Sequence, residues 1–307
     1  MVYAKIILPE PLKRMSILRK GSMERHSKRE KTVNILDKLY WTVQPPIGVI
    51  LGDYFREENW FAPHFAGDQG YHGILEVVRD QEHIVWIRFN EINNPTYYIK
   101  KYQGVSKRLS DYCFFQATKE RTEKTRVVLT NGLVHLENQM IAENRLTGSF
   151  DVLCGASNSI KRSMLPLAEK ISGRLLSKAD GKYYGIAESL GGGVTGHLQV
   201  VINNGSIIQC FYDEIFADRE EEIDDPELKP YYRQSKYHCL DYVSTLGIGF
   251  NIFSEMISAR VQATQNLLDL DGLPFSNEIG CAVEWDNYIR LATKLNACKF
   301  VDRKSVV

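Results

Sequence analysis

The chain has 307 residues, of which 44% are hydrophobic and 25% are charged, a composition typical of a globular protein with room for about two domains. Its 38 Lys and Arg residues equal its 38 Asp and Glu residues in number, so the formal net charge is zero. This balance gives no general reason to expect nucleic acid or an anionic membrane as a partner. No run of about 18 apolar residues is present, so the sequence predicts no membrane span.

Residues 1–46 are predicted to form a basic arm that ends in a short helix. Lys28, Arg29 and Lys31 lie close together, and apolar residues recur over positions 33–40 before a Pro-Pro pair. An arm of this kind is usually solvated surface, and binding of nucleic acid or anionic lipid is the alternative. Because charges and prolines stand where a signal peptide needs an unbroken apolar core, we expect a cytoplasmic chain.

The sequence predicts no metal site. The six cysteines are scattered without a C-x-x-C pair, which indicates buried, reduced thiols in a reducing compartment. His64, His72 and His83 lack the i, i+4 spacing of a helical metal site. The acidic stretch 213–227 lacks the spacing of an EF-hand and is expected to be a solvated loop.

Two stretches of the chain share one pattern. Residues 70–92 match residues 193–215 without a gap, at a constant offset of 123 positions (193 − 70 = 123). Each stretch has β-branched and apolar residues on both sides of a polar turn, which predicts a β-hairpin. The match places Glu91 and Glu214 at equivalent hairpin ends.

The order of elements after each hairpin is also the same. An aromatic-rich segment that looks helical comes first, then a helix, an Asp-containing turn and a closing helix. We therefore predict an α+β fold built of two tandem copies of a small unit with an antiparallel sheet and helices. The first copy spans residues 47–176 and the second spans residues 177–307. A period of this length indicates two copies of one fold and not a solenoid.

The turn of the first copy, DVLCGASNS at residues 151–159, is the most informative stretch. Apolar residues follow it at helical spacing, so the serines are expected at the N-terminus of a helix. That end of a helix carries N–H groups without intrahelical partners and a partial positive charge, which favour a phosphate. The alternative is an ordinary Ser N-cap after a glycine turn.

These features resemble the FMN-binding domain family. The second copy opens with DGKYYGIAES at residues 180–189, which is similar to the first strand of that family. The family's attachment motif, D-x-x-[ST]-G-A-[ST], aligns with residues 151–157. The resemblance implies that Ser157 carries FMN through a phosphoester installed by a flavin transferase, and that the other cofactor-binding residues are Asp151, Cys154, Gly155, Ala156 and Ser159.

The chain departs from the family pattern at several places. Cys154 stands where the family has Ser or Thr, and Ser157 replaces the usual Thr but keeps the hydroxyl. The equivalent turn of the second copy, DLDGLPFSN at residues 269–277, has no Gly-Ala-hydroxyl sequence. We expect FMN, attached covalently or held without a covalent bond, in the first copy only.

The resemblance favours an electron carrier, which works between a flavin-reducing partner and an acceptor that are both unidentified, over a free-standing enzyme. The alternative is a degenerate, cofactor-free pair of units that acts as a binding or assembly module. An enzyme that acts on a small molecule in a cleft between the units is a third possibility.

Two further patterns have simple interpretations. Gly191, Gly193 and Gly196 satisfy G-x-G-x-x-G, but a strand-like sequence follows them where a dinucleotide-binding motif needs a helix. They are predicted to form a hairpin connection. Trp60, Phe61 and Trp86 are expected in the core, or else as apolar surfaces on which a flavin ring stacks.

Overall fold

One continuous antiparallel sheet organises the protein. The computed structural model describes residues 40–61, 70–109, 112–113, 128–239, 242, 244, 247–273 and 283–298, and the predicted basic arm and short helix lie outside them. The strand order is β3-β2-β1-β4-β5-β6. The α+β class expected from the sequence is confirmed. The strands are β1 (Gly48–Phe61), β2 (Tyr71–Asp80), β3 (His83–Asn93), β4 (Gly181–Gly191), β5 (Val194–Asn203) and β6 (Ser206–Phe216).

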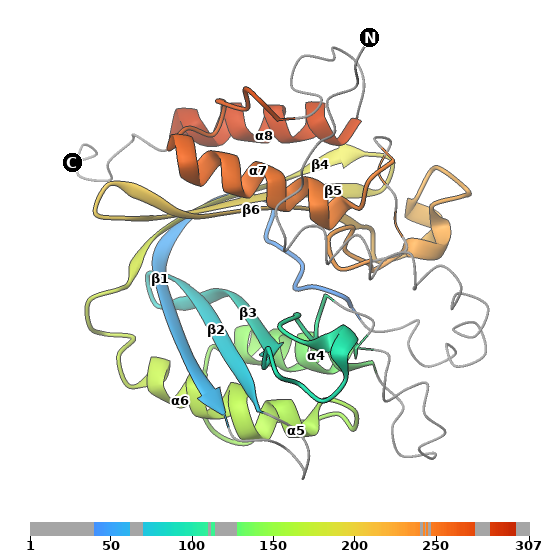
Figure 1. Ribbon diagram of the computed structural model, residues 1–307. Coiled ribbons are helices and arrows are strands. Elements are labelled where there is room, and N and C mark those ends of the chain that lie inside the picture. The colour runs from blue at the N-terminus through green and yellow to red at the C-terminus, as the bar shows by residue number, and fades with distance from the viewer. Residues whose placement is uncertain are drawn as a thin grey trace.

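Helices cover the outer face of each half of this sheet (Figure 1). In the first half these are α4 (Leu129–Ala142), α5 (Ser157–Ser159), the π-helical turn η3 (Ile160–Met164) and α6 (Leu165–Ser172). In the second half they are α7 (Phe250–Thr264) and α8 (Val283–Cys298). Short 3₁₀ turns are η2 (Lys100–Tyr102), η4 (Glu220–Glu222) and η5 (Lys229–Tyr231). The inner faces of the two halves turn toward each other across the curled sheet.

The two predicted copies share this sheet. Strand β1 pairs with β4 in a register that runs from Gly48 opposite Ala187 to Tyr54 opposite Gly181. The predicted boundary after residue 176 falls in the connection between α6 and β4. Backbone hydrogen bonds therefore cross from one half to the other, and each half contributes three strands.

The predicted hairpins are confirmed, and the repeat extends to their details. Strands β2 and β3 begin and end 123 positions before β5 and β6, respectively. Each hairpin has a register shift, between Val78 and Arg79 in the first and between Val201 and Ile202 in the second. The two hairpins thus share their strand lengths and the position of their bulge, whereas β1 has 14 residues and β4 has 11.

The amide residues that follow α4 and α7 are also equivalent. Asn144 and Gln265 both have a positive φ, and each accepts a hydrogen bond from a hairpin N–H, that of Ile84 (2.8 Å) or Ile207 (2.6 Å). Each helix end is thereby attached to the start of the second strand of its hairpin.

Most of the described parts of the aromatic segments after the hairpins are not the helices that the sequence suggested. Apart from the 3₁₀ turns and the helical residues Tyr112 and Cys113, their described backbone turns back along the edge strand, with the N–H of Lys107 donating to the carbonyl of Glu91 and that of Lys236 to Glu214, both at 2.8 Å. Tyr97 and Tyr102 are buried. Their rings fill the end of the core. Packing in the core, and not a helical period, therefore sets the spacing of these residues.

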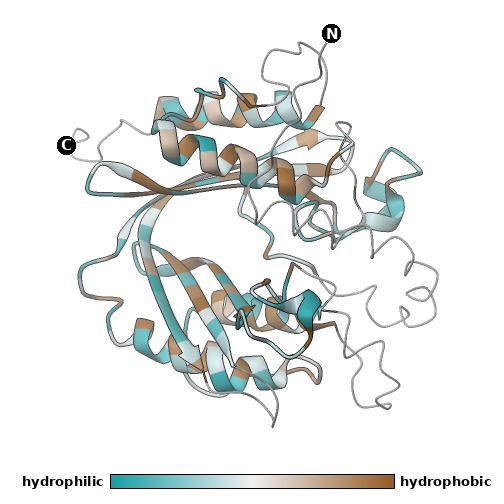
Figure 2. Cartoon of the chain, in the orientation of Figure 1, coloured by the Kyte–Doolittle hydropathy of each residue, from teal (hydrophilic) through white to brown (hydrophobic). Residues whose placement is uncertain are grey.

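Apolar side chains gather in three clusters. Two lie between the sheet and the helices, one in each half, and the third lies on the inner face around Tyr54, Trp86 and Tyr183. Figure 2 shows hydrophobic and hydrophilic residues side by side along the strands and helices, as expected of elements with one buried face. This inner cluster stabilises the curvature at the centre of the sheet.

Each half contains a buried ion pair at the same place. Lys107 Nζ donates to Glu91 Oε2 at 3.0 Å, and Lys236 Nζ donates to Glu214 Oε2 at 2.5 Å. The two glutamates obey the offset of 123, but the two lysines are 129 positions apart. An ungapped comparison therefore misses the lysines, although each follows a serine in a Ser-Lys dipeptide.

Loss of the second ion pair should destabilise the protein strongly. Lys236 also lies 3.9 Å from the buried carboxylate of Glu284, so Lys236→Met leaves two buried acids without their cation, at a cost of about 3–5 kcal/mol. Urea unfolding measures this cost. The matched control is Lys294→Met, because Lys294 pairs with Glu188 at the surface, where an ion pair contributes at most about 1 kcal/mol. Equal losses in the two variants would contradict a stabilising role for the buried pair.

Candidate functional site

The predicted motif forms a turn and the start of a helix. Helical structure begins at Ser157 and continues through η3 to the end of α6 at Ser172. Gly155 has φ +116°, a conformation that favours glycine. Ala156 is buried against α4, where a Cβ on Gly132 would lie only 2.4 Å from the Cβ of Ala156. The Gly-Ala sequence of the motif thus has a structural reason, because α4 and the turn approach closely here.

The structure brings only part of the predicted set together. Ser157 is half-buried at the first helical position, directly after Gly155 and Ala156. Asp151 and Cys154 are exposed. The carboxylate of Asp151 lies 3.2 Å from His135 Nε2, and its backbone N–H donates to Gln139 Oε1 at 3.0 Å. These contacts fix the start of the turn against α4 but do not direct Asp151 toward Ser157.

Ser159 points to the opposite side, under the helix. It is buried, and its hydroxyl donates to Glu91 Oε2 at 2.6 Å, the oxygen that also accepts from Lys107. The same oxygen therefore joins the motif helix, strand β3 and the segment after β3. The repeat showed the equivalence of Glu91 with Glu214, but nothing in the sequence showed that Glu91 meets Ser159.

Several buried polar atoms near this contact have no hydrogen-bond partner among the residues that the structure describes. They are Glu91 Oε1, both amide atoms of Asn93 and the hydroxyl oxygen of Ser163. Asn93 is 0% exposed. A Cβ on Gly73 would lie 2.4 Å from the Ser163 oxygen, so this glycine provides the space that the serine occupies. Unpaired buried polar atoms are rare and often mark a place for water, an ion or a ligand.

The aromatic residues divide between core and surface. Trp86 is buried on the inner face beside Tyr183, with ring centroids 6.2 Å apart, as expected of a core residue. Trp60 is 55% exposed and stacks on His72 at 5.0 Å. Phe61 lies on the opposite face of β1, stacked on Tyr71 at 5.7 Å and next to Gly73. Of the three, Phe61 is the one beside Gly73 and Ser163.

The acidic stretch 213–227 is not entirely the solvated loop that was expected. Asp213 and Glu214 lie in β6 and are buried, whereas Glu220–Glu222 form an exposed 3₁₀ turn. Burial raises the pKa of Asp213 to about 7, although the Ser235 hydroxyl and two backbone N–H groups donate to it. Asp213 and Glu214 belong to a strand that is otherwise largely apolar. The density of acidic residues in the stretch hid this from the sequence analysis.

Asp213, Ser235 and His238 form a chain of contacts but not a nucleophilic triad. The Ser235 hydroxyl donates to Asp213 Oδ2 at 2.5 Å and lies 3.1 Å from His238 Nδ1. A triad places the histidine between the acid and the serine, whereas here the serine lies in the middle. Burial holds the pKa of His238 well below its ordinary value. The cluster is therefore a buried connection between β6 and the segment that follows it.

The remaining expectations can be checked on the described residues. Gly191 and Gly193 flank the turn between β4 and β5, and Gly196 lies in β5, which confirms a hairpin connection. Cys113, Cys210 and Cys239 are buried, but Cys154 is exposed, so the expectation of buried thiols is wrong there. Among the described residues no cluster of three or more His, Cys, Asp or Glu could hold a metal. None of the described helices has the length and apolar character to cross a membrane.

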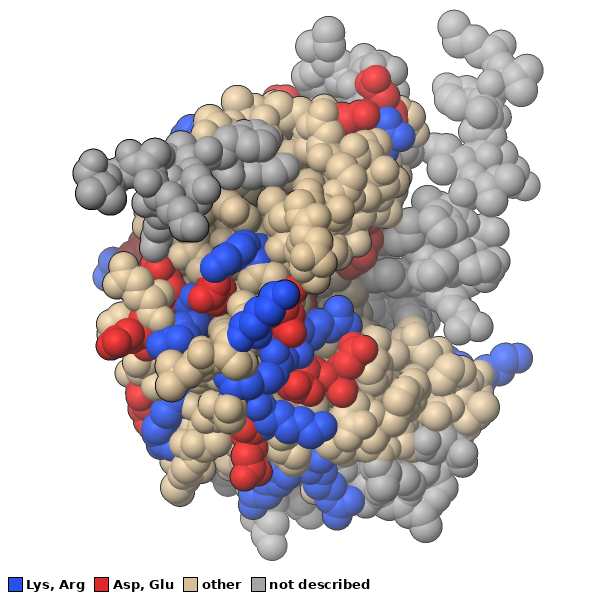
Figure 3. All heavy atoms as spheres, turned by 90° about the vertical axis from the view of Figure 1, so that its left-hand side faces the viewer, with Lys and Arg blue, Asp and Glu red and all other residues tan. Residues whose placement is uncertain are grey.

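Charges of both signs are mixed on the face of Figure 3. Strand β1 and the connection to β4 lie on this side in Figure 1 and carry ion pairs such as Lys182 with Asp53 (2.5 Å) and Arg174 with Asp180 (2.8 Å). Nucleic-acid surfaces gather positive charge instead.

Comparison with known proteins adds no relative. No family model matches the chain, no curated protein matches it, and no solved structure matches it. The resemblance to the FMN-binding family therefore rests on the motif and strand sequences themselves.

The raised pKa of Asp213 predicts a pH-dependent difference between the protein and an Asp213→Asn variant. An unfolded Asp releases its proton near pH 4, whereas the folded protein keeps it until about pH 7. The folded state binds more protons over this window, so the Asp destabilises the protein increasingly as the pH rises from 4 to 7, by on the order of 4 kcal/mol in total. Asn cannot titrate.

Urea unfolding of both proteins at pH 4.5, 6 and 8 measures this difference. We expect the variant to gain stability relative to the parent as the pH rises. A difference that is constant over the three pH values would show that Asp213 ionises normally.

Proposed function

We propose that the protein is an FMN-binding electron-transfer protein that holds the flavin phosphate at the start of the helix beginning at Ser157. The observation that carries this proposal is the turn at Gly155 and Ala156, which presents the Ser157 hydroxyl at that helix start. Directly beneath the same helix lie polar atoms without partners. The proposal keeps the two-copy interpretation, with a flavin in the first half only.

The chemistry of the helix start suits a phosphate. The first N–H groups of a helix lack intrahelical partners, and the helix dipole adds partial positive charge. Lys161 and Arg162 are exposed one turn further on and add two full positive charges. Ser157 is half-buried, so one side of the hydroxyl stays accessible to a transferase that would form the phosphoester.

The residues around the turn also suit the rest of a flavin. The amide of Asn93 and the hydroxyl of Ser163 offer hydrogen bonds that no described residue takes. The partly buried ring of Phe61, stacked on the buried ring of Tyr71, offers an apolar surface next to them. A flavin needs this combination of apolar face and polar edge. When bound, FMN would supply the redox chemistry, and these residues would orient it.

The second half differs at the equivalent place. Tyr212 OH donates to Glu214 Oε1 at 2.6 Å, and Asn287 Nδ2 donates to the same atom at 3.0 Å. The other oxygen of Glu214 accepts from Lys236. Both oxygens of Glu214 therefore have partners, whereas Glu91 has an unpaired oxygen. This contrast supports one flavin for the chain and a structural role for the second half.

A flavin transferase would attach the cofactor, and a reductase and an electron acceptor would be the redox partners. Contacts between redox partners are usually small and transient. The exposed side of the Ser157 turn, with Cys154 and Asp151 at the surface, is the part of the site that such partners would reach.

Ser157→Ala tests the proposal directly. The full chain, co-expressed with a flavin transferase, should carry one FMN-sized adduct by intact mass and remain yellow after acid denaturation. Ser157→Ala should lose the adduct because it lacks the hydroxyl that forms the ester, and Ser157→Thr should keep it.

Ser177→Ala is the matched control, because Ser177 is an exposed serine whose hydroxyl donates to the carbonyl of Arg174. Flavin released into the supernatant by acid, with unmodified protein, would indicate non-covalent binding. Protein that is colourless in every variant would contradict the proposal and favour the cofactor-free module.

A further inference from the structure

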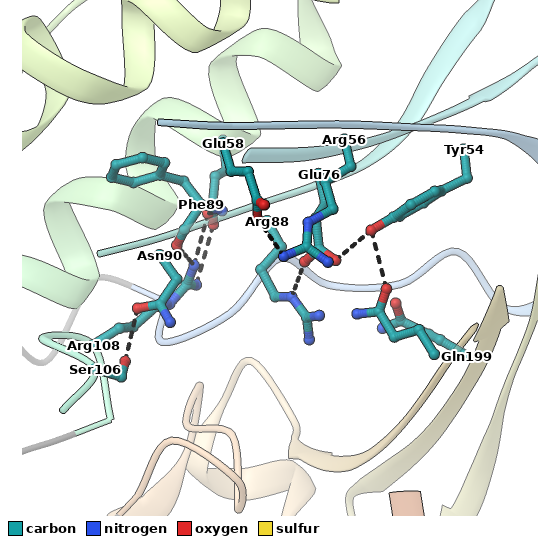
Figure 4. A network of polar contacts seen from close by, with 12 residues as sticks. Tyr54, Arg56, Glu58, Glu76, Arg88, Phe89, Asn90, Ser106, Arg108 and Gln199 are labelled. Carbon is teal, nitrogen blue, oxygen red and sulfur yellow. Dashed lines mark hydrogen bonds and ion pairs between the residues drawn. The ribbon is translucent and has the colours of Figure 1, made fainter. Parts of the chain in front are cut away.

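A separate pocket lies between the two halves of the sheet. Its volume is about 280 Å³, and its walls come from β1, β2, β3 and the segment after β3 on one side and from β6, α7 and the segment after β6 on the other. Ser157 is not among the residues that line it. Figure 4 shows the polar contacts along the first-half wall. Because the sheet curls, residues far apart in the sequence enclose one space.

We infer that this pocket binds a small organic carboxylate, with Arg88 as its main ligand. The inference is independent of the flavin site and concerns other residues. It rests on the terminal nitrogens of Arg88, on the ion pairs in the walls and on the size of the pocket.

Arg88 has hydrogen-bond donors that no other described residue uses. Its Nε donates to Glu76 Oε2 at 2.7 Å, while its two terminal nitrogens bond to none of the other described residues. The guanidinium lies over the ring of Phe211, 4.5 Å from the centroid, and the side chain is 19% exposed. In Figure 4 it extends from β3 toward the second half. An arginine held in this way presents a planar pair of donors that matches a carboxylate.

Glu76 is already satisfied and does not compete for the free side of Arg88. It accepts from the Tyr54 hydroxyl at 2.5 Å as well as from Arg88, and it is buried. Burial opposes its ionisation, but the Arg88 guanidinium outweighs this and lowers the pKa of Glu76. Glu76 thus balances the positive charge of Arg88 on the Nε side, and the terminal nitrogens of Arg88 face the pocket.

Arg108 forms a fixed part of the pocket wall. It is 3% exposed and held by Glu137, with Nη1 at 2.7 Å and Nη2 at 3.2 Å from the two carboxylate oxygens. Nη1 also donates to the carbonyl of Phe89 at 2.9 Å. Its Nε is buried and has no hydrogen-bond partner among the described residues. Arg88 therefore supplies the donors that a ligand in the pocket can reach.

The charges of the walls limit the ligand to a single negative charge. Each arginine of the pocket is paired with an acid, Arg56 with Glu58, Arg88 with Glu76 and Arg108 with Glu137. His238 adds no charge, because burial keeps its pKa well below the ordinary value. The walls therefore carry no excess positive charge. One carboxylate can share the Arg88 guanidinium with Glu76, whereas a second negative charge on the ligand would have no cation to balance it.

The size of the pocket and its apolar walls define the part of the ligand that is attached to the carboxylate. The pocket volume of about 280 Å³ is at the lower end of the range of ligand pockets, which suits a small molecule. Ile74, Leu109 and Phe211 supply apolar surface. The ligand class is therefore a small aromatic or aliphatic monocarboxylate. Because both halves line the pocket, such a ligand would also connect them.

A panel of matched acids and amides tests the inference. Benzoate, phenylacetate, cinnamate and hexanoate are each compared with the corresponding amide in thermal unfolding of the full chain, at constant ionic strength. We expect at least one acid to raise Tm more than its amide, with an affinity confirmed by calorimetric titration. Arg88→Lys should weaken that affinity by about tenfold or more, because lysine keeps a charge beside Glu76 but lacks the planar fork.

Two further variants separate binding from folding. Ile74→Trp should abolish binding by filling the pocket without changing a charge. Arg260→Lys is the matched control, because Arg260 lies on α7 but pairs with Asp269 outside the pocket; it should bind like the parent. The inference is overturned if every acid acts like its amide, or if Arg88→Lys and Ile74→Trp bind the acid as tightly as the parent does.

Discussion

The pairing of β1 with β4 is the constraint on which the rest of the molecule depends. It joins two similar halves through backbone hydrogen bonds, so neither half can turn independently of the other. The twist of six antiparallel strands then curls the sheet, and Arg88 on one edge strand reaches Phe211 on the other. The inner core, the pocket between the halves and the outward position of the helices all follow from this continuity.

The sequence predicted what is local and repeated. The observed hairpins agree to within one residue with the predicted stretches 70–92 and 193–215, because the alternation of apolar residues is a local signal and the offset of 123 relates one hairpin to the other. The pairing of Lys107 with Glu91 was missed because the connections after β3 and β6 differ in length, which breaks the ungapped match. The aromatic segments looked helical, but Tyr97 and Tyr102 take their positions from the core. The single sheet could not be predicted, because strand order across the boundary leaves no periodic signal.

The turn at residues 151–159 was likewise predictable in part. That Ser157 begins a helix after a glycine was predictable from residue types, and the structure adds the reason for the neighbouring alanine, which is its contact with Gly132. The direction of each side chain was not predictable. Cys154 faces solvent and Ser159 faces Glu91, a separation that depends on the packing of the helix against the sheet.

The chain segments that follow β3 and β6 have a consequence for association with other proteins. Each runs back along the outer edge of its strand and bonds to it, through the bridges Ile92 with Ser106 and Ile215 with Ser235. Exposed strand edges are the usual templates for strand addition and for aggregation. Here the ends of both edge strands are occupied by the protein's own backbone. A protein that docks at these ends must therefore recognise side chains on loops and helices, and it cannot extend the sheet there.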